Sequence, residues 1–215
     1  MTLILGRKRG MTQLFAEDGT ATGVTVVEAG PCVATQIRTD DNDGYNAVQW
    51  SFEDVRESRC TKPRIGHFKK ADVAPKRYMR EERLSAASTV GVGEERCVDA
   101  FETGMLVDVI GTTKGRGFAG TIKRHGFSRG PKTHGSKNYR APGSIGCSAY
   151  PSRVFKGKRS SGHYGNSRQT TKNLKVMGVD LDRNLLFIKG AVPGAINGFV
   201  QVQTAKTGTK TPKKR

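Results

Sequence analysis

The sequence predicts a mainly β fold: a small closed antiparallel barrel that carries a long, mostly irregular basic arm. Many short strand candidates, bounded by turn residues, occur on both sides of the stretch 109–179. That stretch spans 71 residues without an Asp or Glu, and few segments of the chain show a helical pattern. Because strands are predicted both before and after this stretch, we expect them to pair in one barrel, with the stretch inserted between two of its strands. The arm is therefore expected to leave and re-enter a single domain.

The elements before the arm are mostly strands. Glu17-Asp18-Gly19 is a hairpin signal ahead of the first clear strand, and Gly30-Pro31 ends that strand. Residues 54–88 include Lys62-Pro63 and Ala74-Pro75, and we interpret them as an irregular insertion with a short helix. The predicted strands are 22–28, 32–38, 45–52, 97–101 and 105–110, and the predicted helix is 77–84.

After the arm, the strands 174–179, 184–189 and 199–204 complete the predicted barrel. The barrel domain is thus discontinuous in sequence. It comprises residues 1–112 and 173–205, with the partly helical insertion at about 54–88. The basic arm comprises residues 113–172, and a basic tail comprises residues 206–215.

Positive charge is concentrated in the arm and the tail. The stretch 109–179 holds 15 of the 37 Lys and Arg residues and 13 of the 27 Gly, and residues 206–215 hold five more cations. Removing both sets of cations from the formal net charge of +18 leaves −2 for the other 134 residues. Self-repulsion in the arm adds to an ordering cost of about 1–2 kcal/mol per residue, so the arm cannot fold by burying itself. We expect a polyanion to order it.

Nucleic acid is the polyanion that fits this composition. Binding to an anionic membrane would require an amphipathic helix or an apolar anchor, and a glycine-rich stretch without an apolar face offers neither. No apolar run approaches the length of a membrane span, and the first residues lack a signal-peptide pattern. We expect a cytoplasmic protein that binds nucleic acid and no membrane.

The residues that could support metal or enzyme chemistry are poorly placed for it. Cys32, Cys60, Cys97 and Cys147 form no CxxC pair, so reduced thiols are expected. The four histidines lack ligand spacing, and a catalytic Cys147–His163 pair would have no nearby carboxylate to orient the imidazole. The sequence predicts no metal site, no small-molecule substrate and no enzymatic activity.

The segment 115–120 matches the glycine fingerprint of dinucleotide sites. That fingerprint requires an acid about 20 residues later, and the next acid after the segment is Asp180. Nor is the segment surrounded by a parallel βαβ pattern. Instead, the glycines let the backbone approach phosphates while neighbouring cations supply charge. We expect no cofactor.

Cations of the arm, with one histidine, are the predicted RNA contacts. Aromatic rings recur among them, and such rings stack on unpaired bases at about 1–3 kcal/mol each. Alternatively, some of these rings, Phe118 first among them, pack against the protein itself where the arm leaves the barrel. The rings are Phe118, Phe127, Tyr139, Tyr150, Phe155 and Tyr164. The predicted RNA contacts are Lys114, Arg116, Lys123, Arg124, Arg129, Lys132, His134, Lys137, Arg140, Arg153, Lys156, Lys158, Arg159 and Arg168.

Several motifs make the chain resemble the universal large-subunit ribosomal protein L3 family. The spacing of Phe101, Asp108, Gly111, Thr113, Gly115, Arg116, Gly117, Gly120 and Arg124 is similar to the family signature. The segments 6–15, 67–71, 117–124, 142–146, 154–158 and 184–194 resemble its bacterial members. Together these matches cover the chain from end to end.

The resemblance implies a six-stranded barrel and an arm that runs through ribosomal RNA towards the peptidyl-transferase centre. It also implies binding near the 3′ end of the 23S-type rRNA, an early role in assembly, and contact with the fourteenth and nineteenth large-subunit proteins. The arm's tip would correspond to about 141–153. The tip residues implied to lie near that centre are Gly143, Ser144, Ile145, Gly146, Cys147, Ser148, Ala149 and Tyr150.

One tip residue departs from the family pattern. Many bacterial members carry an N5-methylated glutamine at the position that Ala149 occupies here. The modification is therefore expected to be absent from this chain.

Two other classes of function are compatible with parts of the sequence. A nucleic-acid chaperone or translation factor could use a similar barrel, but a factor would normally carry a nucleotide site or a second folded domain. A nicotinamide enzyme would have to bind its cofactor at Gly117. Which arm cations meet bases rather than phosphates, and whether the tail contacts RNA, is left open by the sequence.

Overall fold

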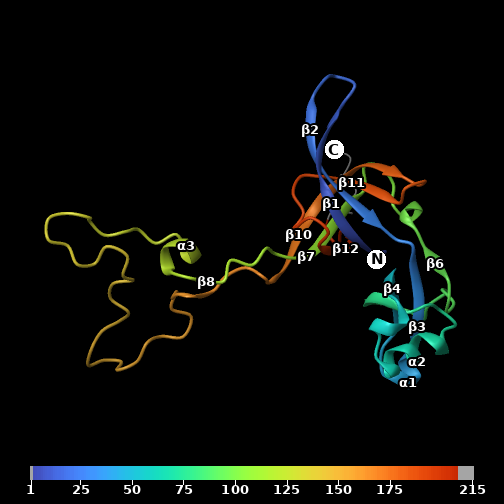
Figure 1. Ribbon diagram of the computed structural model, residues 1–215, viewed down its shortest axis with the longest axis horizontal. Coiled ribbons are helices and arrows are strands. Elements are labelled where there is room, and N and C mark those ends of the chain that lie inside the picture. Colours follow the sequence, from blue (N-terminus) through green and yellow to red (C-terminus); the bar gives the residue numbers. More distant parts are fainter. Residues whose placement is uncertain (1, 208–215) are drawn as a thin grey trace, which may run out of the picture. The chain divides into compact units, whose positions relative to one another are not determined.

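The computed structural model describes residues 2–207 of the chain. Two compact units are present, and Figure 1 shows their elements in the colours of the sequence. Met1–Thr112 and Arg168–Arg215 make up the first, which we call the barrel unit. Thr113–Ser167 makes up the second, the inserted unit. The end of the predicted arm, residue 172, lies inside a strand of the barrel unit.

Six antiparallel strands of the barrel unit form a closed barrel, which confirms the predicted fold class. The strands follow the order β1-β12-β7-β10-β11-β2, and β2 closes the ring by pairing with β1. Their bounds are β1 Leu3–Phe15, β2 Ala21–Ala29, β7 Leu106–Thr112, β10 Arg168–Asp180, β11 Leu185–Lys189 and β12 Phe199–Thr204.

The barrel interior is filled by alternate residues of its strands. Val107 and Val109 of β7, like Val200 and Val202 of β12, are fully buried. The next residue along each strand points the other way, as the two-residue period of a strand requires. β-branched side chains suit this half-buried pleated surface. Their burial, at about 25 cal/mol per Å² of apolar area, is the main term that holds the barrel together.

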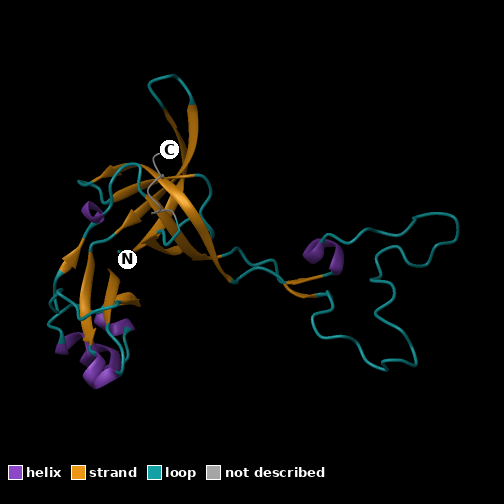
Figure 2. Ribbon diagram, turned by 180° about the vertical axis from the view of Figure 1, so that it is seen from behind, coloured by secondary structure: helices purple, strands orange, loops and turns teal. Residues whose placement is uncertain are grey.

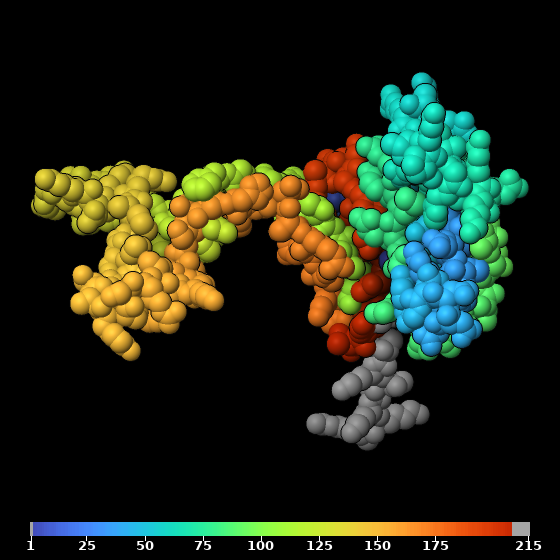
Figure 3. Space-filling view, turned by 90° about the horizontal axis from the view of Figure 1, so that it is seen from below, coloured from blue at the N-terminus to red at the C-terminus, as the bar shows by residue number. Residues whose placement is uncertain are grey.

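A second, four-stranded sheet packs on the same core. Its order is β5-β4-β3-β6, with β3 at Cys32–Arg38, β4 at Ala47–Asp54, β5 at Lys76–Arg83 and β6 at Glu95–Arg96. The strands predicted at 32–38 and 45–52 are therefore present, but they belong to this sheet rather than to the barrel. Tyr78 of β5 stacks on Phe199 of β12 at 4.2 Å between ring centroids. In Figure 3, teal atoms of this region accordingly adjoin red atoms of the C-terminal strand.

Two predicted elements are wrong. The helix predicted at 77–84 is absent, and residues 77–83 lie in β5, because pairing with β4 and the burial of Glu82 outweigh the helix propensity of this charged segment. Residues 97–101 hold the 3-10 helix η2, Val98–Ala100, rather than a strand.

The helices of the barrel unit are short. α2, Lys62–Lys70, contains Pro63 in its first turn, where a missing N–H costs nothing, so this proline starts a helix instead of preventing one. The 3-10 helix η1, Glu57–Arg59, precedes it. α1, Asp40–Asp43, is a single turn that ends at Gly44.

The inserted unit has little regular structure. A two-stranded ladder joins β8, Phe118–Ala119, to β9, Gly162–His163, and α3, Thr121–His125, follows β8. The segment 126–161 contains no helix or strand and is drawn as teal loop in Figure 2. The predicted irregularity of the arm is confirmed for this segment.

Candidate nucleic-acid interface

The inserted unit contains no acidic residue to neutralise its cations. Thr113–Ser167 includes 12 Lys and Arg residues and no Asp or Glu. Seven ion pairs occur among residues 2–207, and each of them joins residues of the barrel unit. The positive potential of the inserted unit is therefore fully available to an external polyanion.

Thirteen of the fourteen predicted RNA contacts have exposed side chains. Arg124 is the exception: it is half-buried, and its Nη1 donates a 2.9 Å hydrogen bond to the carbonyl of Ser160. It ties α3 to the returning chain, and we assign it a positioning role. Arg168 differs in location, since it begins β10 in the barrel unit. The others are distributed along the ladder, α3 and the loops of the inserted unit.

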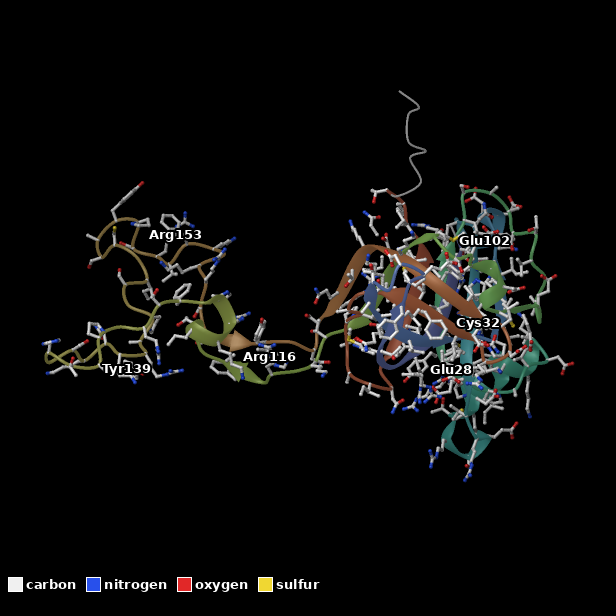
Figure 4. The ribbon with its side chains drawn as sticks, turned by 90° about the horizontal axis from the view of Figure 1, so that it is seen from above. Glu28, Cys32, Glu102, Arg116, Tyr139 and Arg153 are labelled. Atoms are coloured by element: carbon white, nitrogen blue, oxygen red, sulfur yellow. The ribbon has the colours of Figure 1, made fainter. Side chains whose placement is uncertain are left out.

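Backbone hydrogen bonds hold the two chain segments of the inserted unit together where it begins and ends. Thr113 N donates to Ser167 O at 2.9 Å, and Arg116 and Tyr164 are joined in the same way at 2.9 Å. The guanidinium of Arg116 lies 5.1 Å from the centroid of the Tyr164 ring, a cation–π contact. Figure 4 shows Arg116 beside the short strand of this ladder.

Glycine is required where the returning segment of the inserted unit passes close to the backbone of the outgoing segment. Gly165 has φ +72°, and a Cβ there would overlap the carbonyl of Lys114. Its role could not be recognised in the sequence, because the contact joins segments about fifty residues apart.

A loop farther along the inserted unit is organised around Tyr139. The Tyr139 hydroxyl accepts a 3.0 Å hydrogen bond from Arg129, and the ammonium of Lys132 lies 5.4 Å from the ring centroid. Gly130 N donates to the carbonyl of Tyr139 at 3.0 Å, which closes the loop. The Tyr139 ring thus contacts two cations, and it lies among loop side chains in Figure 4.

The predicted tip, 141–153, is exposed except at Pro151, which is half-buried. All residues from 141 to 150 are exposed, and Tyr150 retains 88% of its surface. Short-range hydrogen bonds shape the loop: Ser144 Oγ donates to the carbonyl of Gly146 at 3.2 Å, and Ser152 Oγ donates to that of Ala149. An exposed tyrosine ring of this kind is well suited to stack on an unpaired base.

An apolar hollow lies beside the tip. Its volume is about 350 Å³, and its lining includes Phe127, Ile145, Val154, Phe155 and Lys158. The two phenylalanines are among the predicted stacking rings and Ile145 is among the predicted tip residues, whereas Val154 is in neither set. The alternative that Phe118 packs against the arm's base is wrong, because this ring is 79% exposed.

The glycine fingerprint does not sit in a nucleotide-binding fold. Its residues lead into the two-residue strand β8 and the five-residue helix α3, without the parallel βαβ unit of dinucleotide sites.

Over the described part of the chain, no cluster of three His, Cys, Asp or Glu side chains could hold a metal ion. No helix within residues 2–207 is long and apolar enough to cross a membrane.

A small β-barrel that carries a long, irregular and acid-free insertion defines a class of basic proteins whose insertion is suited to contact a polyanion. Comparison with known proteins agrees with this class. A family model described as Ribosomal protein L3 matches residues 81–184. A curated "Large ribosomal subunit protein uL3" from Brachyspira pilosicoli is 51% identical over 98% of this chain and 97% of its own. One from Pelotomaculum thermopropionicum is 54% identical over 94% and 96%, and one from Herpetosiphon aurantiacus is 52% identical over 96% and 98%.

The chain therefore belongs to the ribosomal protein L3 family, which confirms the resemblance inferred from its motifs. Members of this family are structural, non-enzymatic components of the ribosome in the cytoplasm.

Proposed function

We propose that the protein is a structural constituent of the large ribosomal subunit and that its inserted unit binds the 23S-type rRNA. The observation that carries this proposal is the acid-free inserted unit, with twelve cations and no internal ion pair in Thr113–Ser167. Repulsion among these cations is relieved when phosphates lie between them. The names of the relatives, all large-subunit proteins, support the same assignment.

Phosphate contacts from exposed Lys and Arg would position the inserted unit, and exposed rings would stack on unpaired bases. The loops of 126–161 have few contacts of their own to fix them, so their final order is expected to form with the RNA. The protein would neutralise phosphates where RNA helices converge on it. This is a scaffolding role that needs no bond-making chemistry.

The family resemblance supports a more specific placement. The protein would bind near the 3′ end of the rRNA and act early in assembly, with the tip at about 141–153 directed towards the peptidyl-transferase centre. Because Ala149 has no side-chain amide to methylate, the tip's contacts would be made by its neighbours, including Cys147 and Tyr150. The neighbouring proteins would include the fourteenth and nineteenth of the large subunit.

Sedimentation tests this assignment. Nearly all of the protein should remain with the large subunit through a moderate salt wash, and cross-links should map from the inserted unit to rRNA. A translation factor or nucleic-acid chaperone would instead be distributed between the subunit and the free pool. Recovery of most of the protein in the washed supernatant would contradict the proposal.

A further inference from the structure

An arginine-lined cleft lies in the barrel unit, outside the inserted unit. Its volume is about 500 Å³, and it forms where the end of β4, the start of β5 and the region of η1 and α2 meet. These elements are in the cyan to teal part of Figure 1. The cleft is lined by the side chains of Arg56, Arg59, Arg64 and Arg77, with Asp54 as its single acid.

The acid of the cleft is already neutralised. The carboxylate of Asp54 forms a 2.7 Å ion pair with Lys76, and Arg77 contacts Glu53 at 3.3 Å. Arg56 and Arg59 are exposed and form no ion pair with any residue of 2–207. Two guanidinium groups therefore face the cleft without a counter-charge, although the 134 residues outside 109–179 and 206–215 have a formal net charge of only −2.

The framework of the cleft is held by Arg64. Its Nη2 donates hydrogen bonds of 2.5 Å to the carbonyls of Lys76 and Arg77, which fixes the start of β5 against α2. Its Nε is buried and has no hydrogen-bond partner among the described residues. A buried charged N–H group without an acceptor is costly, and an anion in the cleft would reduce that cost.

The start of α2 adds to the positive potential. Thr61 at the N-cap makes no side-chain capping hydrogen bond, so backbone N–H groups of the first turn remain without intrahelical acceptors. Cys60 and Arg64, on either side of this helix start, both line the cleft. Free N–H groups at a helix start favour the binding of phosphate. A planar guanidinium group can donate two parallel hydrogen bonds to the oxygens of one phosphate.

We propose that this cleft binds a backbone phosphate of the rRNA, which gives the barrel unit an RNA contact of its own. The inference rests on the proposed function, since it takes the rRNA as the source of the phosphate. Arg56 and Arg59 clamp the phosphate oxygens, while Arg64 acts as a positioning residue. An RNA strand fits better than a free phosphate ion because the cleft is open to solvent and its two unpaired arginines lie on an exposed segment.

The test compares full-length variants for binding to 23S-type rRNA over a range of salt concentrations. Arg56→Gln with Arg59→Gln should reduce affinity roughly tenfold and lower the log–log salt slope by about 0.7–0.9, the value for one phosphate. Lys69→Gln with Lys70→Gln is the matched control, because it removes the same charge from exposed positions of α2 that do not line the cleft. The control should change affinity less than twofold.

Two further measurements separate the possible outcomes. Arg56→Lys with Arg59→Lys keeps the charge but not the paired donors, so it should keep the salt slope and lose affinity. Inorganic phosphate at constant ionic strength should not displace the RNA, and displacement would identify a free-anion site and overturn the proposal. Equal losses in the Gln pair and its control would also overturn it. The cleft variants are also combined with substitutions of the inserted unit's cations. If the cleft variants still weaken rRNA binding in that background, the cleft contributes to binding independently of the inserted unit, on which the proposed function rests.

Discussion

The indole N–H of Trp50 donates a 2.8 Å hydrogen bond to the carboxylate of Glu82, and both side chains are buried, with 1% and 5% of their surface exposed. The same carboxylate accepts a hydrogen bond from the backbone N–H of Leu3 at 3.0 Å and pairs with Arg96 at 2.6 Å. Glu82 therefore joins the start of β1 to β4 and to β6. This carboxylate links the second sheet to the barrel.

Replacement of Glu82 by Ala should destabilise the protein strongly. The change leaves a buried indole N–H, a backbone N–H and a guanidinium without their acceptor, and loss of one partner of a buried ion pair costs about 3–5 kcal/mol. Chemical denaturation measures the loss. Glu81→Ala is the control, since Glu81 pairs with Arg38 at 3.3 Å on the surface and should cost about 1 kcal/mol or less. Equal losses in the two variants would contradict the assigned role of Glu82.

Gly165→Ala should disrupt the ladder at which the inserted unit begins and ends. The substitution forces a side chain into φ +72° and against the carbonyl of Lys114. A non-glycine residue in this region costs about 1–2 kcal/mol before the overlap is counted. Amide chemical shifts of residues 113–117 and 164–167 should change, while those of the barrel stay. Gly120→Ala, where an added Cβ meets nothing within 4 Å, should leave both sets unchanged.

Limited proteolysis of the free protein should cut the inserted unit first. Its loops have exposed cations that trypsin recognises and no strand or helix within 126–161. Addition of rRNA should protect the same bonds. An inserted unit that resists trypsin in the absence of RNA would show that it is ordered on its own, contrary to the coupled ordering proposed above.

The cysteines should differ sharply in their reactivity. Burial raises the pKa of the Cys32 thiol to about 12, and this side chain is fully buried. Cys147 is exposed in the tip. Alkylation should label Cys147 in the native protein and Cys32 only on unfolding, as mass spectrometry can measure. Rapid labelling of Cys32 in the native state would contradict the packing of β3 on the barrel.

The raised pKa also fixes a direction for stability against pH. The folded protein holds the Cys32 proton more tightly than the unfolded chain, whose thiol has a pKa near 9.0. This contribution is complete below pH 9 and is lost as pH rises towards 12. Cys32→Ala should therefore flatten the fall in the free energy of unfolding over that range.

Part of this fold can be predicted from local patterns. β12 has the predicted bounds because Val200–Gln203 alternates apolar and polar residues after the turn at Pro193-Gly194. The helix expected at 77–84 shows the limit: Glu82 looks like a surface residue in sequence, and its burial depends on Trp50, which is 32 positions away. The separation of the strands into a barrel and a second sheet depends on the same kind of distant pairing.

The candidate interface was predictable for a different reason. The absence of acids from a long segment is visible without any knowledge of contacts, and exposure of its cations follows from their charge. The arginine cleft was not predictable in this way. Arg56, Arg59, Arg64 and Arg77 are interleaved with acids in the sequence, and the lining emerges only when β5 folds against α2.

The most direct test of the account is the salt dependence of rRNA binding by an inserted-unit variant. Arg153→Gln, Lys156→Gln and Lys158→Gln together remove three exposed cations, whereas Lys69→Gln, Lys70→Gln and Lys189→Gln remove the same charge from exposed sites of the barrel unit. If the inserted unit binds phosphates, the first triple variant should lower the log–log salt slope by about 2–3, at about 0.7–0.9 per phosphate. The second triple variant should leave the slope nearly unchanged. Equal slopes for the wild type and the first triple variant would contradict the claim that this unit is the principal RNA-binding element.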